Sequence, residues 1–139
     1  MIKGLLTLFF TFTLLNAQSD YELKLYETII PSIFKDRPLR VYLDSDMQSM
    51  LQNSKKFTIV KECDDSVNLL IGKKFQNLPA ICRDKPLFAT KYRTFKEHPN
   101  SFGAFYWRKG RPQIKFKKST LFKYGIDLPN SLQRYINDK

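Results

Sequence analysis

The sequence predicts an α/β fold in three layers, with a mostly parallel sheet, helices on both faces and an antiparallel hairpin late in the chain. Three observations lead to this prediction. Strand and helix patterns alternate through the first half of the chain, which is typical of a parallel sheet. Residues 67–71 are almost continuously apolar, as in a strand covered on both faces. Two later apolar runs, residues 102–107 and 113–116, are joined by a glycine-containing loop, residues 108–112, of hairpin length.

The first half of the chain begins with a helix pattern. Apolar residues recur at helical spacing over residues 20–35, and Pro31 should kink or end that helix because it lacks an amide donor. A strand is expected at residues 39–43, and the acidic triplet after it caps a short helix that contains Leu51. The other strands expected in this half are residues 57–60, 67–71 and 87–90.

The second half of the chain adds short helices around the hairpin. One is expected within residues 91–99, and two more, residues 118–124 and 129–137, close the chain. Gly125 at the end of one closing helix and Pro129 at the start of the next fit the usual preference of these residues for helix termini.

The composition describes one compact domain. The chain has 139 residues, of which 42% are hydrophobic and 14% aromatic, enough to build a core and to exclude global disorder. Lys and Arg outnumber Asp and Glu by 24 to 13, which gives a formal net charge of +11. This charge favours anionic partners, and attraction to an anionic membrane surface is the simplest such interaction.

The first 17 residues have the pattern of a secretory signal peptide. Lys3 precedes an apolar run over residues 5–15, and Ala17 is a small residue suited to cleavage. The run is shorter than the roughly 20 apolar residues of a membrane span, although an uncleaved N-terminal anchor is the alternative. We therefore expect residues 1–17 to direct the chain to the periplasm and residues 18–139 to form a single domain there. This location excludes nucleic acid as a partner.

The cysteine count fits an exported domain. Cys63 and Cys82 are the only cysteines, and in an oxidising compartment such a pair forms a disulfide. Two reduced, buried thiols are the alternative. Because a zinc site needs three or four ligands and His98 is the single histidine, we expect neither a metal nor another cofactor.

The sequence contains no pattern of catalytic residues, so we expect no enzyme. His98 lies in a polar, turn-forming stretch, where a histidine is usually solvated. The carboxylate pairs Asp44/Asp46 and Asp64/Asp65 lie next to expected strand ends, where capping explains them. Neither a glycine-rich phosphate loop nor a zinc-protease motif occurs.

A ligand site is predicted where the parallel strands end. Ligands of open α/β sheets bind beyond the carboxyl ends of the strands, and here basic residues follow those ends. A carboxylate, a phosphate or an anionic polymer would suit this rim, unless its lysines are simply solvated. The candidate ligand-binding residues are Ser45, Lys73, Lys74, Lys91 and Tyr92.

A partner-binding site is predicted at the tip of the hairpin. Exposed aromatic residues beside arginines are enriched at the centres of protein interfaces. The alternative is that Trp107 packs into the core and leaves a solvated basic turn. The candidate partner-binding residues are Tyr106, Trp107, Arg108, Lys109 and Arg111.

An ordered set of motifs runs through nearly all of the expected domain. A Cys-Asp pair, an apolar strand and a glycine span residues 63–72, and a strand leads into a loop at residues 85–90. Further along the chain follow Gly103, the Gly-Arg turn and strand of residues 110–116, Leu121, the Gly-Ile-Asp-Leu segment of residues 125–128 and residues 132–136. Together these segments resemble the YfiR-like family of periplasmic regulators.

The resemblance implies a three-layer α/β domain, often a homodimer, without enzymatic activity. Such proteins bind and restrain the periplasmic part of an inner-membrane signalling protein, typically a diguanylate cyclase and sometimes a sensor kinase. We therefore expect a regulatory binding protein whose binding depends on a ligand or on the redox state of Cys63 and Cys82. A small periplasmic solute-binding protein for an anion is the alternative.

Overall fold

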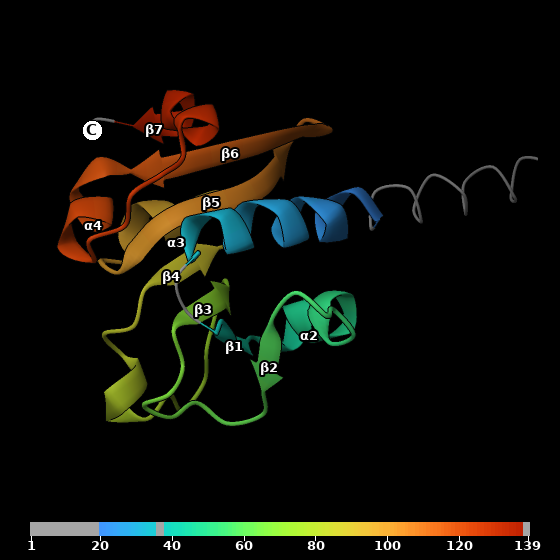
Figure 1. The fold of residues 1–139 in the computed structure, drawn as a ribbon, viewed down its shortest axis with the longest axis vertical. Coiled ribbons are helices and arrows are strands. Elements are labelled where there is room, and N and C mark those ends of the chain that lie inside the picture. The colour runs from blue at the N-terminus through green and yellow to red at the C-terminus, as the bar shows by residue number, and fades with distance from the viewer. Residues whose placement is uncertain (1–19, 36–37, 138–139) are drawn as a thin grey trace, which may run out of the picture.

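A computed structural model of the chain describes residues 20–35 and 38–137. Its strands form one seven-stranded sheet in the order β2-β1-β3-β4-β5-β6-β7 (Figure 1). The strands are β1 (Arg40–Leu43), β2 (Thr58–Val60), β3 (Leu69–Gly72), β4 (Leu87–Ala89), β5 (Ser101–Arg108), β6 (Arg111–Lys117) and β7 (Ile136–Asn137). Strands β1 to β5 pair in parallel, β6 is antiparallel to β5, and β7 is parallel to β6. The predicted α/β class, with its late antiparallel hairpin, is confirmed.

Helices cover both faces of the sheet. The first helix (residues 20–33) lies in front of the sheet in Figure 1, and α3 lies behind it. The other helical segments are α2 (Ser45–Leu51), α3 (Tyr92–Glu97), α4 (Lys118–Lys123) and the 3-10 helices η1 (Ala80–Cys82) and η2 (Asn130–Tyr135). Strand β3 is buried on both sides: Ile71 packs with the first-helix core, whereas Leu70 packs with the cysteine pair on the other face. The two-sided cover that the apolar run predicted is confirmed.

The main core lies between the first helix and the sheet. Aromatic rings from the helix and from three strands meet there at centroid distances of 5.8 to 6.4 Å, mostly edge to face or tilted. This arrangement suits the quadrupoles of the rings and adds to the hydrophobic gain of burying them. The rings are those of Tyr26, Phe88, Phe102, Phe105 and Phe116.

The strand order reverses between β1 and β3. After β1 the chain adds β2 on one side, and then crosses to add β3 on the other. Such a reversal separates the connections that follow the two strands and opens space beyond their carboxyl ends. Asp44 and Gly72, at the ends of β1 and β3, lie at this point.

Two predicted elements differ from the structure. The hairpin turn is shorter than the predicted loop, because Lys109 and Gly110 adopt φ values of +52° and +75°, the left-handed pair of a two-residue turn. The predicted final helix over residues 129–137 is wrong. Residues 130–135 form the 3-10 helix η2, and β7 then pairs with β6, because the free edge of β6 offers partners to the last backbone amides and carbonyls.

The first helix continues through Pro31, which was expected to kink or end it, and ends two residues later at residue 33. The predicted signal peptide, residues 1–17, lies outside the described residues. Within the described part of the chain, no helix has both the length and the apolar character needed to cross a membrane.

Candidate binding surfaces

Asp44 organises the carboxyl edge of the sheet at the point where the strand order reverses. It is only 5% exposed, and its carboxylate caps α2 by accepting the backbone N–H of Met47 at 3.1 Å. The other carboxylate oxygen accepts the backbone N–H of Lys73 at 2.8 Å and that of Lys74 at 3.4 Å. Gly72 makes this approach possible, because a Cβ there would lie 2.4 Å from the Asp44 carboxyl carbon. The predicted capping role of Asp44 is confirmed.

Four of the five predicted ligand residues, all except Tyr92, lie at this edge, but its charges are largely balanced. The Lys73 ammonium pairs with the Asp46 carboxylate at 2.7 Å, and this bond lowers the pKa of Asp46 and raises that of Lys73. Lys91 adds to the lowering of the Asp46 pKa. Ser45 and Lys74 are exposed at the same edge. The rim is therefore a mixed acidic and basic surface.

Tyr92 belongs to a different surface from the other predicted ligand residues. Its ring lies 5.5 Å from the ring of Tyr106, and the Lys115 ammonium stands 5.3 Å above it. Tyr92 is therefore turned toward the hairpin, on the α3 side of the sheet. The structure thus divides the predicted ligand residues between the carboxyl edge and the α3 side.

The aromatic residues of the predicted hairpin site point to opposite faces, since neighbouring strand residues alternate. Tyr106 is buried under α3, and among the described buried side chains its hydroxyl is the one polar group without a hydrogen-bond partner. Trp107 is half-buried against the first helix, where its indole N–H donates to Glu22. The exposed part of the predicted site is therefore its basic turn, Arg108, Lys109 and Arg111.

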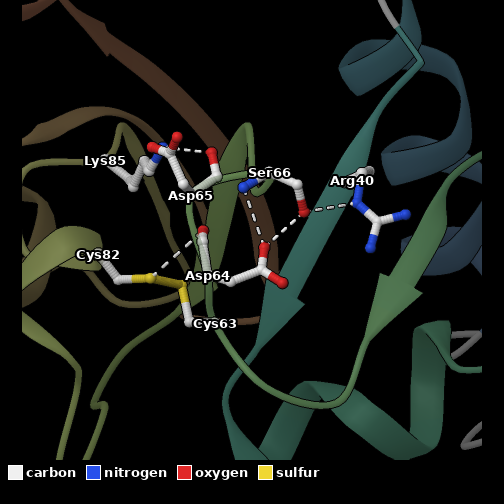
Figure 2. A network of polar contacts seen from close by, with 7 residues as sticks. All are labelled: Arg40, Cys63, Asp64, Asp65, Ser66, Cys82 and Lys85. Carbon is white, nitrogen blue, oxygen red and sulfur yellow. Dashed lines mark hydrogen bonds and ion pairs between the residues drawn. A yellow bond between two sulfur atoms is a disulfide. The ribbon is translucent and has the colours of Figure 1, made fainter.

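A disulfide joins Cys63 to Cys82 across a Cα–Cα distance of 6.2 Å (Figure 2). The predicted pairing is confirmed. The bond fastens the loop before β3 to η1, and both cysteines pack with Val67, Leu70 and Leu87. This small cluster covers the face of β3 that the first helix does not reach.

Polar contacts hold the loop after Cys63 in place (Figure 2). The Asp64 carboxylate accepts the Ser66 backbone N–H at 2.9 Å as well as its hydroxyl, and these bonds lower the pKa of Asp64. The Ser66 hydroxyl oxygen in turn accepts from the Arg40 guanidinium at 2.8 Å. The Lys85 ammonium donates to the Asp65 carbonyl at 3.0 Å and lies 3.6 Å from the Asp65 carboxylate. Both carboxylates of this pair therefore have local structural roles.

A groove of about 840 Å³ opens beside this loop, at the amino ends of the parallel strands. It is bordered by residues 32–35 at the end of the first helix, by Asn68 and Lys85 before β3 and β4, and by residues 124–130. These segments are far apart in the sequence, and the expectation for open α/β sheets directs attention to the opposite edge. The sequence therefore does not predict this groove.

His98 ends α3 in a half-buried, basic environment. Its Nδ1 accepts the backbone N–H of Asn100 at 3.2 Å, and burial, with Lys117 and Lys123 nearby, lowers its pKa. The sequence predicted a solvated loop histidine. Within residues 20–35 and 38–137, no three His, Cys, Asp or Glu side chains are arranged to hold a metal ion.

We expect the stability of the protein to fall as the pH drops below about 6.5, the ordinary histidine pKa. The folded-state pKa of His98 lies below that value, so the unfolded chain binds the proton first as the pH falls. The contribution of neutral His98 to the free energy of unfolding is therefore present above about pH 6.5 and is lost as the pH falls toward the folded-state pKa. Urea unfolding from pH 5 to 8 measures this loss. A His98→Asn variant, which lacks the only histidine, is the control and should show a flatter profile. Identical profiles would contradict the prediction.

No protein-family model matches the chain, and a search of curated proteins finds no match either.

Proposed function

We propose that this protein is an exported, non-enzymatic binding protein that regulates the external part of a membrane-bound signalling enzyme, a diguanylate cyclase or a sensor kinase. The observation that carries the proposal is the placement of the motif residues that resemble the YfiR-like family. Two parts of that set, Gly103 and the Gly-Ile-Asp-Leu segment, lie at packing points in the last third of the domain, where each has an identifiable role in building the fold.

Gly103 on β5 is one of these motif residues. A Cβ at this position would lie 2.7 Å from the Phe116 ring on the paired strand β6 and 3.1 Å from the Phe88 ring. Glycine therefore lets the ring of Phe116 lie against the neighbouring strand. The hairpin and its cover by the first helix depend on this close approach.

The Gly-Ile-Asp-Leu segment, residues 125–128, also belongs to the motif set. Gly125 has a φ of +62° and ends α4, and the Ile126 N–H returns to the Leu121 carbonyl at 2.9 Å, the bond of a glycine-terminated helix. Ile126 and Leu128 then pack on the main core. The spacing of glycine and two apolar residues is thus explained by helix termination followed by core packing, which supports a shared fold.

The disulfide supports the proposed location. Structural disulfides persist in oxidising compartments such as the periplasm and are rare in the cytosol. Cys63 and Cys82 are both buried, and their bond holds the cover of one sheet face. A chain with this bond and an N-terminal secretory pattern is best suited to act outside the cytoplasm.

The proposed mechanism is a shift in equilibrium. The domain binds one conformation of the partner's external segment more tightly than another, and so changes the population of the active state. The exposed basic turn of the hairpin, Arg108, Lys109 and Arg111, offers charges to an acidic surface on that partner.

Capture from cell envelopes tests the proposal. A tagged protein is cross-linked in intact cells, and we expect a membrane protein with an external domain to be recovered with it. Recovery should fall when Arg108 and Arg111 are both replaced by Glu. The matched control replaces Lys55 and Lys56, which are exposed before β2, by Glu and so changes the net charge equally. If no membrane protein is captured under either oxidising or reducing conditions, the proposal fails.

The groove favours a second candidate, a small-solute binding protein. Its volume of about 840 Å³ lies within the range of small-molecule sites, about 300 to 1,000 Å³. Calorimetric titration with phosphate, carboxylates and amino acids distinguishes the two functions. Binding that is lost in a Lys85→Ala variant would favour the solute-binding function.

A further inference from the structure

The positive charge of the chain is concentrated in one segment. Between Lys91 and Gly125 there are ten Lys and Arg residues and a single acidic residue, Glu97. Elsewhere the two signs are nearly balanced. The segment comprises α3, β5, β6 and α4, so most of the net charge of +11 belongs to one end of the sheet.

Helix α3 and strand β6 share a basic surface on the face opposite the first helix. The Lys115 ammonium lies over the Tyr92 ring, and that of Lys117 lies 5.2 Å above the Phe95 ring. Lys117 also donates to the Phe95 carbonyl at 2.7 Å. Lys96 follows Tyr92 by one helical turn and is exposed on the same stripe of α3.

Helix α4 packs its Leu121 in the main core, borders this surface and adds an exposed aromatic ring. The Lys123 ammonium donates to the Asn100 side chain at 2.7 Å, which joins α4 to the segment between α3 and β5. Lys118 and Phe122 are four residues apart on α4 and both exposed, and Phe122 is 89% exposed. We name the set Lys96, Lys115, Lys117, Lys118, Phe122 and Lys123 the α3–α4 surface.

We propose that the α3–α4 surface docks on an anionic phospholipid bilayer, with Phe122 inserted at the headgroup level. The charge supplies complementarity to anionic headgroups, and each basic residue near such a surface adds to the attraction. The exposed ring selects a membrane over a free polyanion, because an apolar side chain flanked by lysines is the arrangement of interfacial anchors. The contact is independent of the regulatory role proposed above. It would hold the protein beside the membrane in which a partner lies.

Vesicle co-sedimentation tests this docking. The protein is expressed from its full sequence, purified, and mixed with vesicles of phosphatidylcholine alone or with 30% phosphatidylglycerol. We expect binding to the anionic vesicles, weak binding to the neutral ones, and a marked loss at high salt, since salt screens exposed charges. A Lys96→Gln/Lys118→Gln variant should bind the anionic vesicles about tenfold more weakly or worse. A Phe122→Ser variant should lose affinity severalfold and keep its stability.

Matched controls identify the surface. A Lys55→Gln/Lys56→Gln variant removes the same charge beside β2, the strand at the far edge of the sheet, and should bind like the unaltered protein. An Ile81→Ser variant removes a 52% exposed apolar side chain on η1 and should also have no effect. Because all variants share one N-terminus, their differences report the α3–α4 surface alone. Polyglutamate serves as a soluble polyanion without a bilayer. The proposal is overturned if the protein binds neutral and anionic vesicles equally, or if the two lysine-pair variants bind the anionic vesicles equally. It is also overturned if the protein binds polyglutamate as tightly as the anionic vesicles and Phe122→Ser has no effect.

Discussion

Replacing Asp44 by alanine should lower the free energy of unfolding by about 2 to 4 kcal/mol. The change removes the cap of α2, typically worth about 1 kcal/mol, and leaves the Lys73 amide without its carboxylate partner, which costs about 1 to 3 kcal/mol more. Since Asp44 is 5% exposed, water does not readily replace these bonds. Urea unfolding of the two proteins measures the difference.

Asp46 provides the comparison for this substitution. It lies two residues further on, but its bond to Lys73 is on the surface, so Asp46→Ala should destabilise the protein far less than Asp44→Ala. An Asp44→Asn variant keeps an acceptor for the Met47 amide, so its free energy of unfolding should lie between those of Asp44→Ala and Asp46→Ala. If Asp44→Ala is no more destabilising than Asp46→Ala, the buried carboxylate does not organise this edge.

Loss of the disulfide should lower the free energy of unfolding by about 3 kcal/mol, because the unfolded chain is then free of a closed loop of this length. A Cys63→Ala/Cys82→Ala variant makes the change directly. The apolar cluster with Val67, Leu70 and Leu87 also loses its outer cover, so the loop before β3 should open at lower denaturant than the rest.

Reductant separates this effect from the packing of the sulfur atoms. Unfolding is followed with and without dithiothreitol in both proteins. The unaltered protein should be destabilised by reductant, and the double variant should not respond. An unaltered protein that unfolds identically in both conditions would show that the bond contributes nothing to stability.

Local pattern was enough to predict the class of the fold. The apolar run of β3 indicates a strand that is covered on both faces, and the alternation of strands with helices supplies that cover. Together they indicate a parallel sheet. The order of the strands depends on contacts between distant segments, which no local pattern contains. β7 was missed for the same reason, since its two residues form a strand only because the edge of β6 is free.

Parts of the candidate sites could likewise be predicted from local sequence, whereas other parts depend on the fold. The disulfide followed from the cysteine count, and capping by Asp44 from its place after a strand. The opposite directions of Tyr106 and Trp107 follow from strand alternation, which the hairpin prediction did not apply. The balance of charge at the carboxyl edge was hidden, because only the fold brings Lys73 to Asp46.

Trp107 is the only tryptophan of the chain, and it touches the first helix through Glu22 and the ring of Tyr21. Its fluorescence is therefore a built-in optical reporter for one event, the departure of that helix from the sheet. A shift of the emission to longer wavelength, as the indole meets water, would mark the event without any attached dye. The same signal would tell whether a bound membrane or partner disturbs the amino-terminal part of the domain.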